Sequence, residues 1–132
     1  MIFFNCFDFD RPASGNRPGG LLNLSTMEII FRGKRPNGAW VYGDLVRANS
    51  HSYIVCDGYH YPVYSHTVGQ YIGAKDRDGN KIFEGDILRW DNVFCYEVVS
   101  KPMGWELVDK KFKSEPPQPS FLFVNGNIHD NQ

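Results

Sequence analysis

Short apolar runs, each bounded by glycine, proline, asparagine or aspartate, follow one another along the chain from about residue 27 onward. Runs of this length that are rich in β-branched and aromatic residues are typical of strands, and turn signals spaced by roughly 8–12 residues favour a sandwich or a barrel. No window shows the i, i+3, i+4, i+7 spacing of a long amphipathic helix. We therefore predict an all-β, mainly β fold with about ten short strands, at residues 29–31, 40–46, 53–56, 59–61, 71–72, 82–83, 87–90, 93–99, 105–108 and 121–124.

Two Asp-Gly pairs lie between such runs, at Asp57-Gly58 and at Asp78-Gly79. A type I′ hairpin turn requires positive φ at both of its central residues, and Asp-Gly is among its preferred pairs. We therefore predict one hairpin around each pair. A single turn of helix near residues 65–70 is the most helical structure that we expect.

Residues 1–26 differ in pattern from the rest of the chain. An aromatic start is followed by a stretch rich in glycine and proline at residues 11–20, which is typical of a flexible loop. A second methionine, Met27, lies where the strand pattern begins. We expect residues 1–26 to be either an over-extended reading frame, with the true start at Met27, or a natural arm that makes contacts through its phenylalanines.

Composition and charge narrow the classes of function. The 132 residues are 42% hydrophobic and 15% aromatic and have a formal net charge of −1, which fits a globular chain long enough to bury its own core. A dedicated nucleic-acid-binding module usually has a pI above about 9 or a basic stripe, whereas the densest basic group here is three lysines in residues 110–113. The first ten residues lack the basic start and the apolar length of a secretion signal. We expect a cytoplasmic protein without a membrane segment.

Metal-binding patterns are absent from the sequence. The acidic residues of 76–86 begin like a calcium loop, but the glycine falls at the fourth position instead of the sixth, so a hairpin tip explains them better. The histidines are dispersed, and the three cysteines (Cys6, Cys56 and Cys95) contain no Cys-x-x-Cys pair. This spacing indicates free thiols in a reducing compartment and neither a metal site nor a cofactor site.

Catalytic patterns are equally weak. No glycine-rich phosphate loop and no nucleophile in an elbow-like context are present. Asp44, Glu84 and Asp86 could in principle form an acid–base pair, but their positions beside glycines fit turn formation better. We therefore predict a protein with no catalytic residues.

Aromatic side chains are more numerous than a small core requires. Packing explains most of them, but tyrosine and tryptophan also anchor protein interfaces and stack on bases in small barrels that bind single strands. A face that exposes them would be the working surface, since large exposed apolar patches mark interaction sites. The candidate residues for this surface are Trp40, Tyr42, Tyr61, Tyr71 and Trp90.

Three ordered motifs resemble the YopX family of bacteriophage and prophage proteins. The central motif lies in residues 67–87, where TVGQYIG, KD, DG and IFEGDI follow one another as in the family signature. FR followed by WVYGDL, in residues 31–45, resembles the family's opening motif, and GNIHDN, in residues 126–131, resembles its closing motif. The resemblance covers about residues 31–131 and departs from the family pattern at Ala74, where leucine is usual.

The resemblance implies a fold and a setting but no activity. It implies two small β subdomains: an N-terminal one at about residues 27–83 and a small five-stranded barrel at about residues 84–125, followed by a C-terminal tail. It also implies a phage or prophage gene product that works in a bacterial cytoplasm. Physically, most of the signature reads as scaffold, because its Asp-Gly and Glu-Gly-Asp segments form turns.

We expect a non-enzymatic binding or accessory protein whose partner is a host or phage protein, with a homo-oligomer as one form of that interaction. A small nucleic-acid-binding β-barrel is the first alternative, and steeply salt-dependent affinity would favour it. An enzyme with an unrecognised acidic site is the second alternative, and it requires a pocket where the carboxylates converge.

Overall fold

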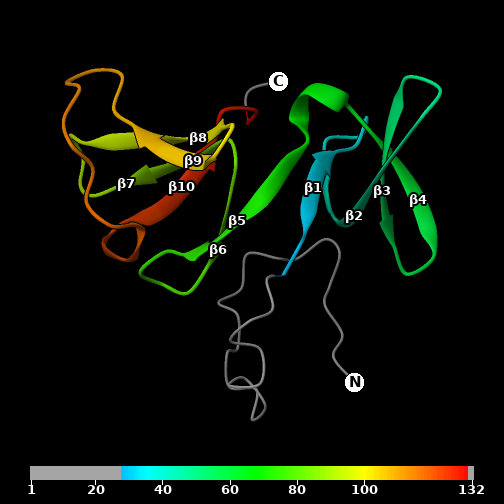
Figure 1. The fold of residues 1–132 in the computed structure, drawn as a ribbon, viewed down its shortest axis with the longest axis horizontal. Helices are drawn as coiled ribbons and strands as arrows, with labels where there is room; N and C mark the ends of the chain where they lie inside the picture. Colours follow the sequence, from blue (N-terminus) through cyan, green and yellow to red (C-terminus); the bar gives the residue numbers. More distant parts are fainter. Residues whose placement is uncertain (1–27, 131–132) are drawn as a thin grey trace, which may run out of the picture.

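Residues 28–130, which the computed structural model describes, form two antiparallel sheets that lie side by side along the length of the molecule (Figure 1). The all-β prediction is confirmed, and the helical segments in this range are two short 3₁₀ turns, η2 (Ser65–Thr67) and η3 (Pro119–Phe121). The first sheet contains, in spatial order, β4 (Tyr59–Val63), β3 (His51–Cys56), β2 (Trp40–Ala48), β1 (Phe31–Lys34), β5 (Gly69–Lys75) and β6 (Lys81–Phe83). The second sheet contains, in spatial order, β10 (Phe123–Asn127), β7 (Asp86–Arg89), β8 (Cys95–Lys101) and β9 (Gly104–Val108).

Each of the ten predicted strands overlaps an observed one, and the expected helical turn is η2. The strands of the first sheet end at Phe83 and those of the second begin at Asp86. Four strands pair in the second sheet within the described residues, with β10 and β9 at its two edges. The five-stranded barrel therefore stays a prediction.

The two Asp-Gly pairs form different turns. Asp57 and Gly58 both have positive φ, 52° and 83°, and alone connect β3 to β4, as a type I′ turn requires. At the other hairpin residues 76–80 connect β5 to β6, and Gly79 has positive φ whereas Asp78 does not. The predicted type I′ turn is wrong there because the Asp76 carboxylate accepts hydrogen bonds from the backbone N–H groups of Asp78 (2.9 Å) and Asn80 (2.8 Å) and so closes a wider turn.

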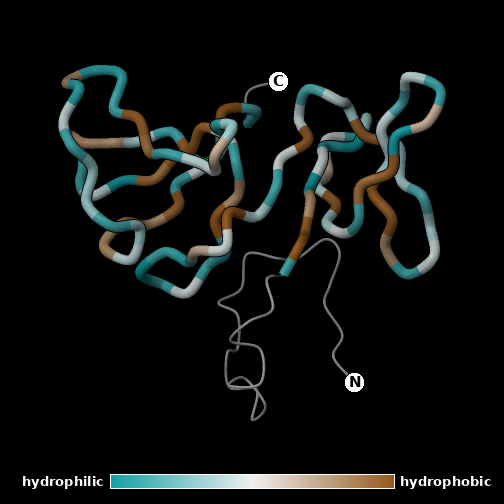
Figure 2. Tube along the Cα trace, viewed as in Figure 1, coloured by the Kyte–Doolittle hydropathy of each residue, from teal (hydrophilic) through white to brown (hydrophobic). Residues whose placement is uncertain are grey.

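Apolar side chains form three clusters, and Figure 2 shows the hydrophobic stretches along the strands of both sheets. Neighbouring residues of a strand point to opposite faces, so the first sheet packs one cluster with Val41 and another with Tyr42. Ile82 of β6 belongs to the cluster of the second sheet, which joins the two sheets through β6. The three clusters consist of Val41, Ile54, Cys56 and Val63; of Ile30, Tyr42, Tyr71 and Phe83; and of Ile82, Leu88, Tyr96, Val98, Leu107 and Leu122.

The central signature motif attaches β5 to the turn that leads into the second sheet. Gln70 donates its backbone N–H to the Glu84 carboxylate (3.0 Å), and Glu84 donates its own to the Gln70 carbonyl (3.0 Å). Gly69 lies so close to this turn that an added Cβ would be 2.7 Å from the Glu84 carbonyl oxygen. The motif therefore acts as scaffold, as its turn residues suggested.

The cysteines follow the prediction in part. Cys95 is a free thiol, as expected, but Cys56 is disulfide-bonded, so the expectation of free thiols is wrong at that position. Cys6 and the rest of residues 1–26 lie outside the described residues. Among those residues, no helix has the length and hydropathy that a membrane crossing requires.

Candidate functional site

A cavity of about 530 Å³ lies between the two sheets, and we call it the intersheet cavity. Its volume falls within the roughly 300–1,000 Å³ that is usual for small-ligand sites. The first sheet contributes residues of β1, β2 and β6 to the lining, and the second contributes residues of β7 and β10. Because β6 and β10 are the sheet edges that face this space, the cavity lies where one sheet ends and the other begins.

A buried ion pair in the wall of the cavity joins the first sheet to the second. The Arg32 guanidinium lies 2.8 Å from the Asp86 carboxylate, and the two side chains are only 6% and 3% exposed. The same carboxylate accepts the Phe83 backbone N–H (2.8 Å), and Arg32 Nη2 donates to the Glu84 carbonyl (3.3 Å). The guanidinium also lies 4.7 Å from the ring centroid of Trp40 and 5.1 Å from that of Phe83. Cation–π contacts of this kind stabilise a desolvated cation.

Two buried polar atoms beside the cavity have no hydrogen-bond partner. These atoms are Arg32 Nε, a donor, and Asn80 Oδ1, an acceptor, and both residues line the cavity. The orientation of the Asn80 amide is fixed because its Nδ2 donates to the Asp76 carboxylate (3.2 Å). Buried polar groups in folded proteins are almost always paired with protein, water or ligand, so these two atoms mark positions where a bound group would complete the pairing.

The three carboxylates considered for acid–base chemistry do not converge. Asp44 is exposed on β2, Glu84 accepts a hydrogen bond from Gln70, and Asp86 is paired with Arg32. Within residues 28–130, no group of three or more His, Cys, Asp or Glu side chains is placed to hold a metal ion. Glu84 and Asp86 thus contribute to the scaffold, and the second alternative, an enzyme with an acidic site, stays a prediction.

The five aromatic residues that the sequence suggested as a binding surface do not form one surface in the structure. Trp40 and Tyr42 line the intersheet cavity. Tyr71 is buried, 5.8 Å from the Phe83 ring, and burial together with the Glu28 carboxylate raises the pKa of its phenol.

The other two nominated residues lie apart from that group. Tyr61 packs on the cluster of Val41, and the Arg35 guanidinium lies 4.9 Å from its ring centroid. Trp90 is 51% exposed and follows β7 in the second sheet. The nominated set is therefore divided among the cavity, the first sheet and an exposed loop.

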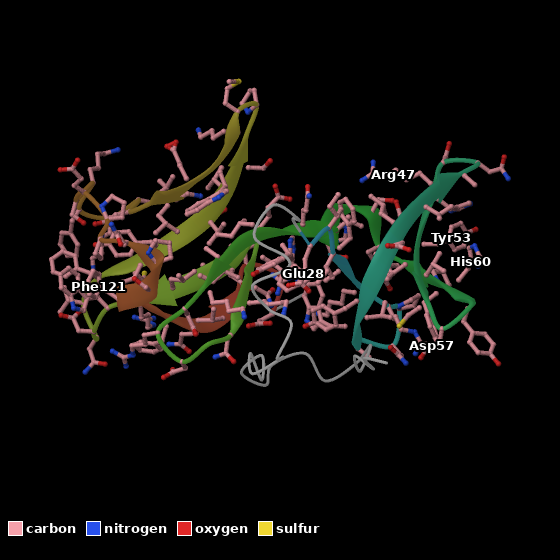
Figure 3. The ribbon with its side chains drawn as sticks, turned by 60° about the horizontal axis from the view of Figure 1, so that its bottom comes forward. Glu28, Arg47, Tyr53, Asp57, His60 and Phe121 are labelled. Carbon is pink, nitrogen blue, oxygen red and sulfur yellow. The ribbon has the colours of Figure 1, made fainter. Side chains whose placement is uncertain are left out.

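Trp90 belongs to a group of exposed apolar side chains at one end of the second sheet. In this antiparallel sheet β7 and β9 end where β8 and β10 begin, so residues 90–94 and 109–122 meet at that end. Figure 3 shows Phe121 at one extreme of the molecule and His60 of β4 near the other. Three side chains at this end, those of Trp90, Val93 and Phe121, are between 51% and 60% exposed. We call it the aromatic loop end, and it consists of the exposed Trp90, Val93, Phe112 and Phe121 together with the half-buried Phe94.

Two aspartates hold the aromatic loop end in the same way. Asp91 Oδ1 accepts the backbone N–H groups of Val93 (2.8 Å) and Phe94 (2.9 Å). In the other loop Asp109 Oδ1 accepts those of Lys111 (3.0 Å) and Phe112 (2.9 Å). The two phenylalanines that end these turns meet edge to face, with ring centroids 5.4 Å apart.

The hydrogen bonds of these turns lower the pKa of both carboxyl groups. Ser114 donates its hydroxyl and its backbone N–H to Asp109, and with the backbone N–H groups of the turn this lowers the pKa of Asp109 to about 2. The backbone N–H groups of Phe94 and Val93 lower the pKa of Asp91. Both turns are therefore closed by carboxylates at neutral pH.

A repeated sequence pattern, which the predictions from sequence did not use, corresponds to these two turns. The pattern Asp-x-x-Phe occurs at residues 91–94 and again at residues 109–112. An aspartate at the start of a turn accepts the N–H groups two and three residues later, so each pattern fixes a phenylalanine at the end of its turn. Only the strand pairing shows that the two phenylalanines meet.

The comparisons with known proteins identify a family and no characterised relative. A family model described as YopX protein matches residues 40–132. No curated protein matches the chain.

Proposed function

The chain belongs to the YopX protein family, and from this premise we propose that it is a non-enzymatic phage or prophage accessory protein that binds a host or phage protein in the bacterial cytoplasm. The aromatic loop end is the surface that we propose for this partner. The observation that carries the proposal is the pair of Asp-x-x-Phe turns, in which half-buried Phe94 packs on the core and supports the exposed Phe112 ring beside exposed Trp90 and Phe121.

Exposed aromatic side chains in a fixed arrangement are suited to protein recognition. Binding loses less conformational entropy when the contact residues are already ordered, and tryptophan is among the residues most often dominant in interface energies. Charges of both signs surround the aromatic loop end, since Lys110 pairs with Glu97 (2.8 Å) and Asp91 lies beside Trp90. A mixed, partly neutralised rim fits a protein surface better than it fits a phosphate backbone.

The test compares three tagged full-length proteins in lysogenic or infected bacterial cells. These are the wild type, the double variant Trp90→Ser/Phe121→Ser, and the control Tyr59→Ser, which changes an aromatic residue that is 67% exposed on β4. Recovered proteins are quantified by mass spectrometry, and thermal melting verifies that each variant is folded. We expect a partner whose recovery falls about tenfold or more in the double variant, as for a hot-spot loss of about 2 kcal/mol, and not in the control. Equal recovery with all three proteins would contradict the proposal.

Nucleic-acid binding remains the second candidate because one observation favours it. Lys111 lies 5.2 Å from the ring centroid of Phe112, and Lys113 follows in the same loop. Basic residues next to exposed aromatic rings are typical of single-strand binding. Titration with single-stranded DNA and RNA at low salt tests this, and affinity that falls with salt and is lost in Lys111→Glu/Lys113→Glu would replace the protein-partner proposal.

For the five-stranded barrel predicted at about residues 84–125, we propose that the β5–β6 hairpin, which precedes those bounds, supplies the fifth strand. Support comes from Arg77, which donates its backbone N–H to the Leu122 carbonyl (2.8 Å), and from Val124, which donates to the Asp76 carboxylate (2.9 Å). The tip of the hairpin therefore lies against β10.

A further inference from the structure

The intersheet cavity contains an unused donor and an unused acceptor. Arg32 Nε is the donor, in a residue that is 5% exposed, and Asn80 Oδ1 is the acceptor. Leaving such a group buried without a partner is costly, because it has lost its hydrogen bonds to water and gained none in return. A ligand that offers a carbonyl oxygen and an N–H group would satisfy both atoms.

The charges that line the cavity largely cancel. Arg32 pairs with Asp86, and Lys81 lies 3.7 Å from the Glu28 carboxylate. A ligand anion would meet Asp86 and Asp130 in the wall, and a ligand cation would meet Arg32 and Lys81. Burial of an uncompensated charge is costly, so the lining favours an uncharged ligand.

The site lies between two strand edges, which is a place where an extended chain can lie alongside the sheets. Both β6 and β10 are edge strands, and both line the cavity. Extended peptides often bind beside sheet edges. Here the backbone N–H groups of Phe83, Val124 and Asn127 already donate to carboxylates. The side chains of Arg32 and Asn80 therefore supply the polar contacts to the peptide. The Trp40 ring adds an apolar wall beside the guanidinium.

We propose that the intersheet cavity is a binding site for an extended, uncharged peptide segment. A peptide carbonyl accepts from Arg32 Nε, and an amide N–H, from the backbone or a side chain, donates to Asn80 Oδ1. This site is separate from the aromatic loop end and does not depend on the protein partner proposed there.

The test uses the full-length, ¹⁵N-labelled protein and four probes. Three are N-acetylated, C-amidated tripeptides with alanine at both outer positions and glutamine, glutamate or lysine in the middle, and the fourth is uridine. The resonances of the Trp40 indole and the Asn80 side-chain amide are followed by NMR during titration. We expect saturable shifts with the glutamine peptide and about tenfold weaker binding of the two charged peptides.

Variants of the cavity sharpen the result. Arg32→Lys keeps a positive charge for Asp86 but removes the Nε–H group, and Asn80→Ala removes the acceptor, so each should weaken binding about fivefold, as for one lost hydrogen bond. Ala39→Phe fills the cavity, whose lining includes Ala39, and should abolish binding. Tyr59→Ser, outside the cavity lining, should have no effect.

Three outcomes would overturn the proposal. They are the absence of saturable shifts with every peptide, unchanged affinity in both Arg32→Lys and Asn80→Ala, and preferential binding of uridine. None of them bears on the aromatic loop end, so the two proposals fail separately.

Discussion

The intersheet cavity and the aromatic loop end use aspartate and aromatic side chains in opposite ways. In the cavity, aromatic rings cover a buried ion pair between Arg32 and Asp86. At the loop end, Asp91 and Asp109 bind backbone N–H groups and thereby fix two loops, of which one packs Phe94 on the core and the other exposes Phe112. The first region uses its polar groups to join the two sheets, whereas the second uses them to fix a surface. Mutations in the two regions should therefore have different consequences.

The largest effect is expected for Asp86→Ala. This change leaves the Arg32 guanidinium buried without its carboxylate and also removes the acceptor of the Phe83 N–H. Breaking one partner of a buried ion pair typically costs about 3–5 kcal/mol. Urea denaturation should show a loss of this size in the free energy of unfolding.

The control for Asp86→Ala is the double variant Arg32→Met/Asp86→Leu, which replaces both charges by apolar groups. It should be more stable than Asp86→Ala, because no uncompensated charge remains. A double variant that is less stable than the single one would show that the pair contributes more than its replacement can.

A smaller loss is expected for Gly69→Ala, in the signature motif. The new Cβ would lie 2.7 Å from the Glu84 carbonyl oxygen, which is backbone and cannot rotate away. Overpacking of this kind usually costs about 1–3 kcal/mol, and the same denaturation experiment measures it. A loss below about 0.5 kcal/mol would mean that the turn at Glu84 can shift, since that is the range of neutral surface changes.

Asp91→Ala should leave global stability unchanged and loosen only its own loop. The backbone N–H groups of Val93 and Phe94 lose their acceptor, so their hydrogen exchange should accelerate while the melting temperature stays the same. Asp78→Ala, in the β5–β6 turn, is the matched control and should leave exchange at residues 93 and 94 unaltered. A lower melting temperature in Asp91→Ala would show that the loop contributes to the stability of the sheet.

The smallest effect is a pH dependence of the second turn. The pKa of Asp109 is about 2 in the folded chain, below its ordinary value of 3.8. A depressed folded-state pKa contributes stability that is fully present above the ordinary value and is lost as the pH falls through the folded-state value. The amide resonances of Phe112 and Ser114 should therefore move between about pH 4 and about pH 2. Asp109→Asn should remove this titration, and a titration that persists in it would have to come from another group.

The sequence predicted those parts of the fold that depend on local residue choice. Apolar runs located the strands, and Asp57-Gly58 specified its turn, because both features act within a few residues. Asp78-Gly79 failed as a type I′ turn because the carboxylate of Asp76 competes for the backbone N–H groups.

The candidate sites were less predictable because they depend on contacts between distant residues. Tyr42 and Tyr71 were expected at a surface because tyrosine is common in interfaces, but both are buried. Strand pairing decides which face of the sheet each side chain occupies. Arg32 was known only as part of a motif, and its partner Asp86 lies in the other sheet. The meeting of Phe94 and Phe112 likewise requires the pairing of β8 with β9.

The bond between Asp76 and the Val124 N–H has a consequence for the order of folding. Most strand pairs of the first sheet join strands that follow one another in the sequence. In the second sheet β10 pairs with the distant β7, so that Phe123 lies opposite Arg89. Contacts between distant residues form later than local ones because they close longer loops. During synthesis the β5–β6 hairpin can form before β10 exists, with Asp76 Oδ2 accepting only the Asn80 side-chain amide. The last strand of the chain, β10, thus supplies both an edge of the second sheet and part of the wall of the intersheet cavity.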